Sequence, residues 1–156
     1  MYLNDEEKSM LNGDFGQAKK WALEHQIKVG KFFSASKFVS VSQAHMMVDP
    51  ESIGIPGVDF LEDLVKKGAK VTIPTITDPR GVDLNYYKPL GQTEEMAEID
   101  RRTIKACTSM GIMMTDTCVN YQTIMPPVYG DHVAYGDTGV VIYSNSVCGA
   151  RSNFEG

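Results

Sequence analysis

The chain contains 156 residues, of which 42% are hydrophobic and 22% are charged, as in a single soluble globular domain. Its formal net charge of −5 disfavours contact with nucleic acid and with anionic membranes, and no apolar run approaches the roughly 18 residues that span a bilayer. The start of the chain is acidic with no apolar signal region after it, and three widely spaced cysteines (Cys107, Cys118 and Cys148) fit a reduced compartment better than a disulfide framework, so a cytoplasmic protein is expected.

Two short helices are expected at the beginning of the chain. Asn4 can cap the first because Glu7 stands at its third helical position, and Asp14 precedes a second helix over residues 15–26. Gly30 is expected to bound this second helix. Apolar residues recur near helical spacing within 15–26, which predicts that one face of the helix packs on a core.

A first strand is expected over residues 37–42, where apolar and polar residues alternate, and this stretch leads directly toward His45. Residues 57–68 should form a helix, because acids stand early, lysines late and a glycine at the end, which matches the helix dipole. A second strand is predicted over 70–73. The proline- and glycine-rich stretch 75–91 is longer than a connection requires, and such loops are either functional or mobile.

The second half of the chain continues the alternation of helices and strands. A helix is predicted over 93–110, with acids first and bases later. The apolar run 112–115 predicts a short strand, and further structured segments are expected at 132–135 and 139–143. Together the elements predict one α/β domain over residues 1–156, with a mixed or largely parallel sheet.

The motifs that usually identify nucleotide-binding loops and serine hydrolases are absent from the sequence. It contains no Gly-x-Gly-x-x-Gly, Gly-x-x-x-x-Gly-Lys-Ser or Gly-x-Ser-x-Gly pattern, and no Cys-x-x-Cys pair. A complete zinc or iron-sulfur site needs three or four close ligands, and the chain offers only separated candidates. These patterns therefore place polar groups at strand ends without defining their chemistry.

Several short segments of the chain nonetheless resemble, in the same order, the landmarks of one protein family. They are residues 5–13, Gln43-Ala44-His45, 57–61, 73–75, Thr117-Cys118-Val119-Asn120-Tyr121, 136–139 and 143–153. Their collinear succession over nearly the whole chain is similar to the aconitase X family. The resemblance implies a layered α/β/α aconitase-like domain that is the N-terminal portion of a large subunit. It also implies a partner, a small subunit or swivelling domain, that residues 1–156 do not contain.

The resemblance further implies a hydro-lyase, which removes water from a small hydroxy acid with an iron-sulfur cluster whose exposed iron acts as a Lewis acid. Cys118 matches a cluster ligand of the family, and the alternative is an inert buried thiol. Cys107 and Cys148 are expected to be packing residues instead. Because about three thiolates hold such a cluster, the other ligands are expected outside this chain, which should be inactive alone.

A substrate pocket is expected around His45 and Arg151. His45 is assigned a catalytic role in handling a proton or contacting the substrate, although a lone histidine is often structural. Arg151 can hold a carboxylate through two charge-assisted hydrogen bonds, while Asn145, Ser146 and Asn153 orient the substrate. The alternative is a capped loop with Arg151 in a structural ion pair.

The favoured substrate is cis-3-hydroxy-L-proline, because a phosphorylated substrate calls for clustered basic groups and only the isolated Arg80 and Arg151 are visible. The alternative within the family is mevalonate 5-phosphate dehydration. A third alternative is non-catalytic, in which a truncated α/β module folds without a cluster and binds a partner or a small ligand.

Overall fold

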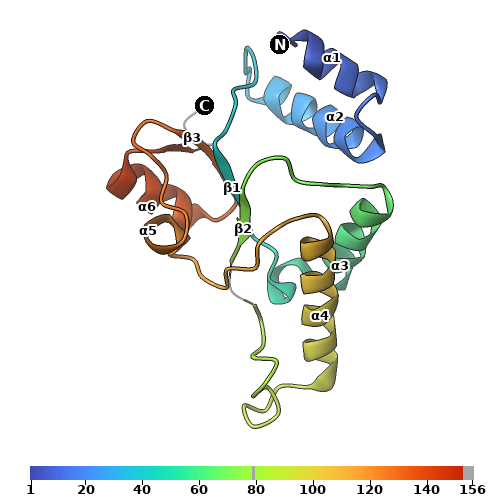
Figure 1. Ribbon diagram of the computed structural model, residues 1–156, viewed down its shortest axis with the longest axis vertical. Coiled ribbons are helices and arrows are strands. Elements are labelled where there is room, and N and C mark those ends of the chain that lie inside the picture. The colour runs from blue at the N-terminus through green and yellow to red at the C-terminus, as the bar shows by residue number, and fades with distance from the viewer. Residues whose placement is uncertain (79, 153–156) are drawn as a thin grey trace.

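The computed structural model describes residues 1–78 and 80–152 (Figure 1). In chain order the elements are α1 (Asp5–Asn12), α2 (Gln17–Phe32), β1 (Gln43–Met46), α3 (Pro50–Lys66), β2 (Thr75–Thr77), α4 (Glu94–Ser109), α5 (Asn120–Thr123), β3 (His132–Tyr135), α6 (Thr138–Cys148) and β4 (Arg151–Ser152). This alternation gives the predicted α/β class. In the part of the chain that the structure describes, no helix combines the length and the apolar character needed to cross a membrane.

The strands form one sheet in which all neighbours are parallel. Their order is β2-β1-β3-β4, so the chain leaves β1 on one side to form β2 and later returns to its other side to form β3. β1 and β3 therefore meet at a topological switch point. Open α/β sheets bind ligands beyond the carboxyl ends of the strands at such a point.

Helices cover both faces of the sheet, which gives the predicted three layers (Figure 1). On one face α3 and α4 enclose a core that includes Leu61, Cys107 and Met110. On the other face α5 and α6 pack over Val133 and Tyr135 of β3. Because side chains alternate across a strand, the residues of β1 that stand beside Tyr135 face the α5–α6 layer as well.

The helices α1 and α2 form a hairpin at the N-terminal end of the molecule (Figure 1). The expected capping box is present, since the N–H of Glu7 donates to Asn4 Oδ1 (2.8 Å) and the N–H of Asn4 donates to Glu7 Oε2 (2.7 Å). Gly30 does not bound α2, which continues to Phe32. A Cβ on Gly30 would stand only 2.8 Å from the sulfur of Met1, so the glycine makes room for this contact.

Two predicted strands lie at neighbouring positions instead. Residues 37–42 are largely exposed without regular secondary structure, and β1 begins directly after them. Residues 70–73 pass beside the end of α4, where the N–H of Val71 donates to the carbonyl of Met110 (2.9 Å), and β2 follows. All three residues of β2 are buried. Strands covered on both faces lack the polar-apolar alternation that predicted the earlier positions.

Smaller corrections apply to two further elements. The apolar run 112–115 contributes only an isolated parallel bridge, from Met113 to Ile76 of β2. The helix predicted over 57–68 is part of the longer α3, which contains a kink at Gly54. The φ angle of Gly54 is 61°, in the left-handed region that glycine enters without steric cost.

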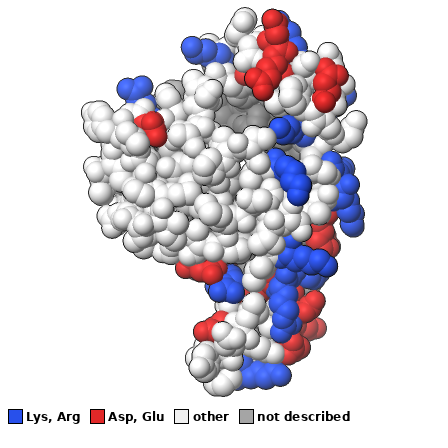
Figure 2. All heavy atoms as spheres, viewed as in Figure 1, with Lys and Arg blue, Asp and Glu red and all other residues white. Residues whose placement is uncertain are grey.

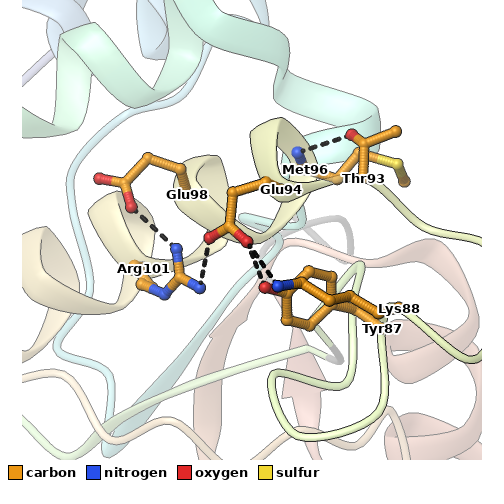
Figure 3. A network of polar contacts seen from close by, with 7 residues as sticks. All are labelled: Tyr87, Lys88, Thr93, Glu94, Met96, Glu98 and Arg101. Carbon is orange, nitrogen blue, oxygen red and sulfur yellow. Dashed lines mark hydrogen bonds and ion pairs between the residues drawn. The ribbon is translucent and has the colours of Figure 1, made fainter.

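The predicted helix over 93–110 is confirmed as α4, and its outer face is charged (Figure 3). Thr93 caps it. The carboxylate of Glu94 pairs with Arg101 (3.0 Å) and accepts a hydrogen bond from the hydroxyl of Tyr87. Arg101 also pairs with Glu98 (2.9 Å). These ion pairs are typical of a helix face that remains in water.

Candidate functional site

Three acidic residues stand just beyond the carboxyl ends of three strands. Asp49 follows β1, Asp78 follows β2 and Asp137 follows β3. Asp78 is only 5% exposed, and its Oδ1 accepts a hydrogen bond from the N–H of Val48 (2.9 Å). Burial raises the pKa of Asp78 against the effect of this hydrogen bond, which favours the charged form. The carboxyl edge of the sheet therefore carries three acidic side chains, one of them buried.

Two of these acids also cap helices. A side-chain oxygen of Asp49 accepts from the N–H of Ser52 (2.9 Å) at the start of α3. In the same way, Asp137 accepts from the N–H of Val140 (2.8 Å) at the start of α6. Such caps satisfy backbone donors that have no partner within the helix. The orientation of both carboxylates is thus fixed by the local chain.

Gly136 lies directly at the switch point between β1 and β3. Its N–H donates to the carbonyl of His45 (3.0 Å). A Cβ at this position would stand 3.2 Å from that carbonyl oxygen and 3.3 Å from the nitrogen of Met47. Any side chain here would push the two strand ends apart.

Cys118 lies near the same acids and is exposed. It follows a segment anchored to the end of β2, where the hydroxyl of Thr115 donates to the carbonyl of Thr77 (2.6 Å). Partial burial raises the pKa of Cys118, and the negative charges of Asp137 and the other two acids raise it further. These surroundings favour the thiol over the thiolate until a cation enters.

His45 lies within β1, not after a strand as its sequence context suggested. It is 2% exposed, and its ring meets that of Tyr135 edge-on with centroids 6.0 Å apart. Neither ring nitrogen has a hydrogen-bond partner among the described residues. Burial lowers the pKa of His45, although Asp137 opposes the shift, so the neutral imidazole is favoured at neutral pH. Buried polar atoms in native proteins normally bind water or a ligand when protein partners are lacking.

The described residues supply one thiol for an iron-sulfur cluster and do not complete its site. Cys107 is fully buried in the α3–α4 core, where burial raises its pKa to about 11. Cys148 is partly buried, and its thiol donates to the carbonyl of Tyr121 (3.5 Å). Within residues 1–78 and 80–152, no three or more His, Cys, Asp or Glu side chains are arranged to hold a metal ion. Cys118 is the cysteine whose exposure suits a ligand role.

The residues predicted to bind substrate lie toward the opposite edge of the sheet. α6 starts at the carboxyl edge and runs back, so Asn145 and Ser146 belong to its final turns. Arg151 is exposed and pairs with His132, the first residue of β3. Asn153 lies outside the described residues. The structure therefore does not bring Arg151, Asn145 and Ser146 together with Cys118 at the carboxyl edge.

A different guanidinium group, that of Arg80, does lie at the carboxyl edge. It forms an ion pair with Asp116 (2.8 Å), two residues before Cys118. Arg80 also lines a small hollow together with Asp49 and Asp78. This places a bidentate anion-binding group close to the strand ends.

Sequence reasoning missed the acids because it placed the first two strands too early. With the correct strand ends, Asp49 and Asp78 stand within three residues of β1 and β2. Asp137 lies in the segment 136–139, which resembled a family landmark but was not predicted to be part of the site. An acid soon after each of three strands is therefore the signal that could have identified this edge.

These features describe an α/β domain with polar side chains gathered at the switch point of a parallel sheet, where such sheets bind ligands. A family model described as the aconitase X first domain matches residues 1–156. The chain therefore belongs to the aconitase X family.

Two named dehydratases and one solved structure are similar to the chain. The phosphomevalonate dehydratase large subunit of Methanothermobacter thermautotrophicus is 36% identical over 100% of this chain and 39% of its own length. The cis-3-hydroxy-L-proline dehydratase of Hypocrea jecorina is 29% identical over 96% of this chain and 25% of its own length. The crystal structure of Thermococcus kodakaraensis aconitase X (holo-form) matches with a TM-score of 0.88 and 33% identity, covering 100% of this chain and 38% of that one. The chain thus spans about two fifths of the archaeal proteins.

Proposed function

We propose that this chain is part of the large subunit of an aconitase X dehydratase, a hydro-lyase that removes water from a small hydroxy acid. The placement of Cys118 carries the proposal. It is an exposed thiol at the carboxyl edge of the sheet, in a family whose similar members are named dehydratases. Thiols and carboxylates bind metal ions, and a neutral histidine accepts protons. The function proposed belongs to the complete enzyme, to which this chain contributes part of the site.

We propose mevalonate 5-phosphate as the substrate, in place of the cis-3-hydroxy-L-proline favoured from sequence. Phosphomevalonate dehydratase large subunits are 36% and 32% identical to the chain over its full length. The two cis-3-hydroxy-L-proline dehydratases are 29% and 25% identical over slightly less of it. The earlier preference rested on the lack of a basic cluster in these residues, but the remaining three fifths of such an enzyme can supply one. In this chain Arg80 is the group proposed to contact an anionic part of the substrate.

Cys118 is proposed as one thiolate ligand of an iron-sulfur cluster, with the remaining ligands from outside the described residues. The cluster, when bound, supplies a Lewis-acidic iron. Burial and the nearby acids raise the pKa of Cys118; the same acids would favour the approach of a cation, and the thiol would give up its proton on binding one. His45 is proposed to transfer a proton through a ring nitrogen, because burial keeps it neutral and its nitrogens lack partners among the described residues.

A small subunit is the proposed protein partner, because the similar archaeal proteins are named large subunits. We also infer a cytoplasmic location. The three cysteines are free thiols in the structure, which suits a reducing compartment.

The test combines this chain with the unmatched part of the Methanothermobacter thermautotrophicus large subunit and a candidate small subunit. After anaerobic reconstitution with iron and sulfide, bound iron and the dehydration of both candidate substrates are measured. Cys118→Ala should lower bound iron and abolish activity, whereas Cys148→Ala should retain both. Unchanged iron content in Cys118→Ala would refute the ligand assignment. Faster turnover of cis-3-hydroxy-L-proline would refute the substrate proposal.

A further inference from the structure

The helix α6 carries no charge on any side, although one of its faces is exposed. Ile142, Tyr143 and Val147 recur at helical spacing and are 55%, 57% and 58% exposed. The inner face contributes Val140 and Val141 to the core. A helix that remains in water normally has a charged outer face, and one that is apolar all round is normally buried. α4 follows the first pattern (Figure 3), whereas α6 has serine, threonine and asparagine but no charged residue, and it exposes large apolar side chains.

The uncharged surface extends beyond α6. Residues 117–150 include two acids and no lysine or arginine, and the lobe that they form is nearly free of charged atoms in Figure 2. Tyr143 stacks on Tyr121 of α5, with ring centroids 6.0 Å apart. Tyr129 is 85% exposed and lies against Gly149, where an added Cβ would stand 2.4 Å from its ring. We name Tyr129, Ile142, Tyr143 and Val147 the α6 outer face.

The same lobe has an open sheet edge. β4 lies at the end of the strand order and contacts α6. Among the described residues it pairs with β3 alone. Its other side therefore presents backbone N–H and C=O groups that a further strand can pair with.

We infer that the α6 outer face and the open edge of β4 form the contact with the remaining part of an aconitase X large subunit. This inference rests on the proposed function, which makes the chain part of such a subunit. The similar large subunits are matched over only 39% of their length, so most of each such polypeptide is available to cover this surface. Permanent contacts are more apolar than exchangeable ones and resemble a domain core cut in half. An apolar helix face beside an open strand edge fits such a permanent contact.

The experiment measures binding of the purified chain to a tagged fragment of the Methanothermobacter thermautotrophicus large subunit, comprising the part outside the matched segment. Biolayer interferometry gives the affinity, and circular dichroism checks that each variant and the tagged fragment itself are folded. The double variant Tyr143→Lys, Val147→Lys should bind at least tenfold more weakly, because lysines cannot be buried there without a partner. The matched control is Phe32→Lys, on α2, where an 81% exposed aromatic side chain is replaced.

Binding by the wild type and the control, with loss in the double variant, supports the inference. It is overturned if the wild type does not bind, or if the double variant binds equally well. It is also overturned if the double substitution instead abolishes self-association of the chain, or its capture of a small subunit, because the surface would then serve a different occupant. No turnover is measured, so a wrong substrate assignment leaves this result unaffected.

Discussion

Thiol reagents should distinguish the three cysteines, and this tests the argument that Cys118 alone is available as a ligand. In the folded chain at pH 8, Cys118 should react first because it is exposed. Cys148 should follow more slowly, since it is partly buried and donates a hydrogen bond. Cys107 should react last, because it is 0% exposed in the core.

The expected slowing of the Cys107 reaction follows from the pKa of this thiol, about 11. At pH 8 about 0.1% of such a thiol is ionised, against about a quarter of an ordinary cysteine with a pKa near 8.5, a difference of about 200-fold. The greater nucleophilicity of a more basic thiolate recovers roughly tenfold, which leaves a rate about 20-fold lower. Burial lowers the rate further by blocking access.

The assay follows release of the chromophore from a disulfide reagent, first under native conditions and then in denaturant. Cys118→Ala should remove the fast phase, and Cys148→Ala should leave it intact. All three thiols should react alike after unfolding. A fast phase that survives in Cys118→Ala, or native labelling of Cys107 at the rate of an unfolded thiol, would refute the reasoning.

Three further predictions concern pH and packing. Burial lowers the folded-state pKa of His45, so the folded protein binds fewer protons than the unfolded chain and should lose stability as pH falls below about 6.5. Between pH 7 and pH 5, the melting temperature of His45→Gln should fall less than that of the wild type. Equal falls in melting temperature would contradict this. Burial raises the folded-state pKa of Asp78, so its charge costs stability above its unfolded pKa; Asp78→Asn, which keeps an acceptor for Val48, should raise the melting temperature at pH 7 by more than at pH 4. Leu61 lies on α3, is 4% exposed and packs into the core. Leu61→Ala should therefore lower the free energy of unfolding, measured in urea, by about 2–5 kcal/mol. Ile55→Ala, at a residue 52% exposed, should change it by no more than about 0.5 kcal/mol, and equal effects would contradict the packing described.

The class of fold was predictable from sequence because helix signals are local. Acids at the start of α4 and the cap at Asn4 depend on neighbours a few residues away, and both appear in the structure. The strands were harder because their burial depends on distant elements. All three residues of β2 are buried, between β1 and the bridge at Met113, so its short sequence, Thr75–Thr77, carries no alternation to detect.

The candidate site was predictable only in part, for a related reason. Cys118 was predicted as a cluster ligand from its family resemblance, and this role stays a prediction; the structure places the residue near the acids that follow the strands. Arg151 resembled a substrate-binding residue in sequence, yet strand pairing sets it beside His132 at the amino edge. Which edge a residue reaches depends on strand register and on the direction of α6, and neither is encoded in the motif itself.

The charges at the carboxyl edge restrict how a phosphorylated substrate can bind. Burial raises the pKa of Cys118, and the charges of Asp137, Asp78 and Asp49 raise it further, so these acids also oppose the approach of a phosphate dianion. Arg80 is already paired with Asp116 (2.8 Å) and offsets only part of it. In the proposed enzyme this edge therefore suits the metal-facing side of the site, and we expect the phosphate to meet basic groups from outside these residues. Substitution of Arg80 should accordingly weaken substrate binding less than removal of the basic groups contributed by the rest of the enzyme.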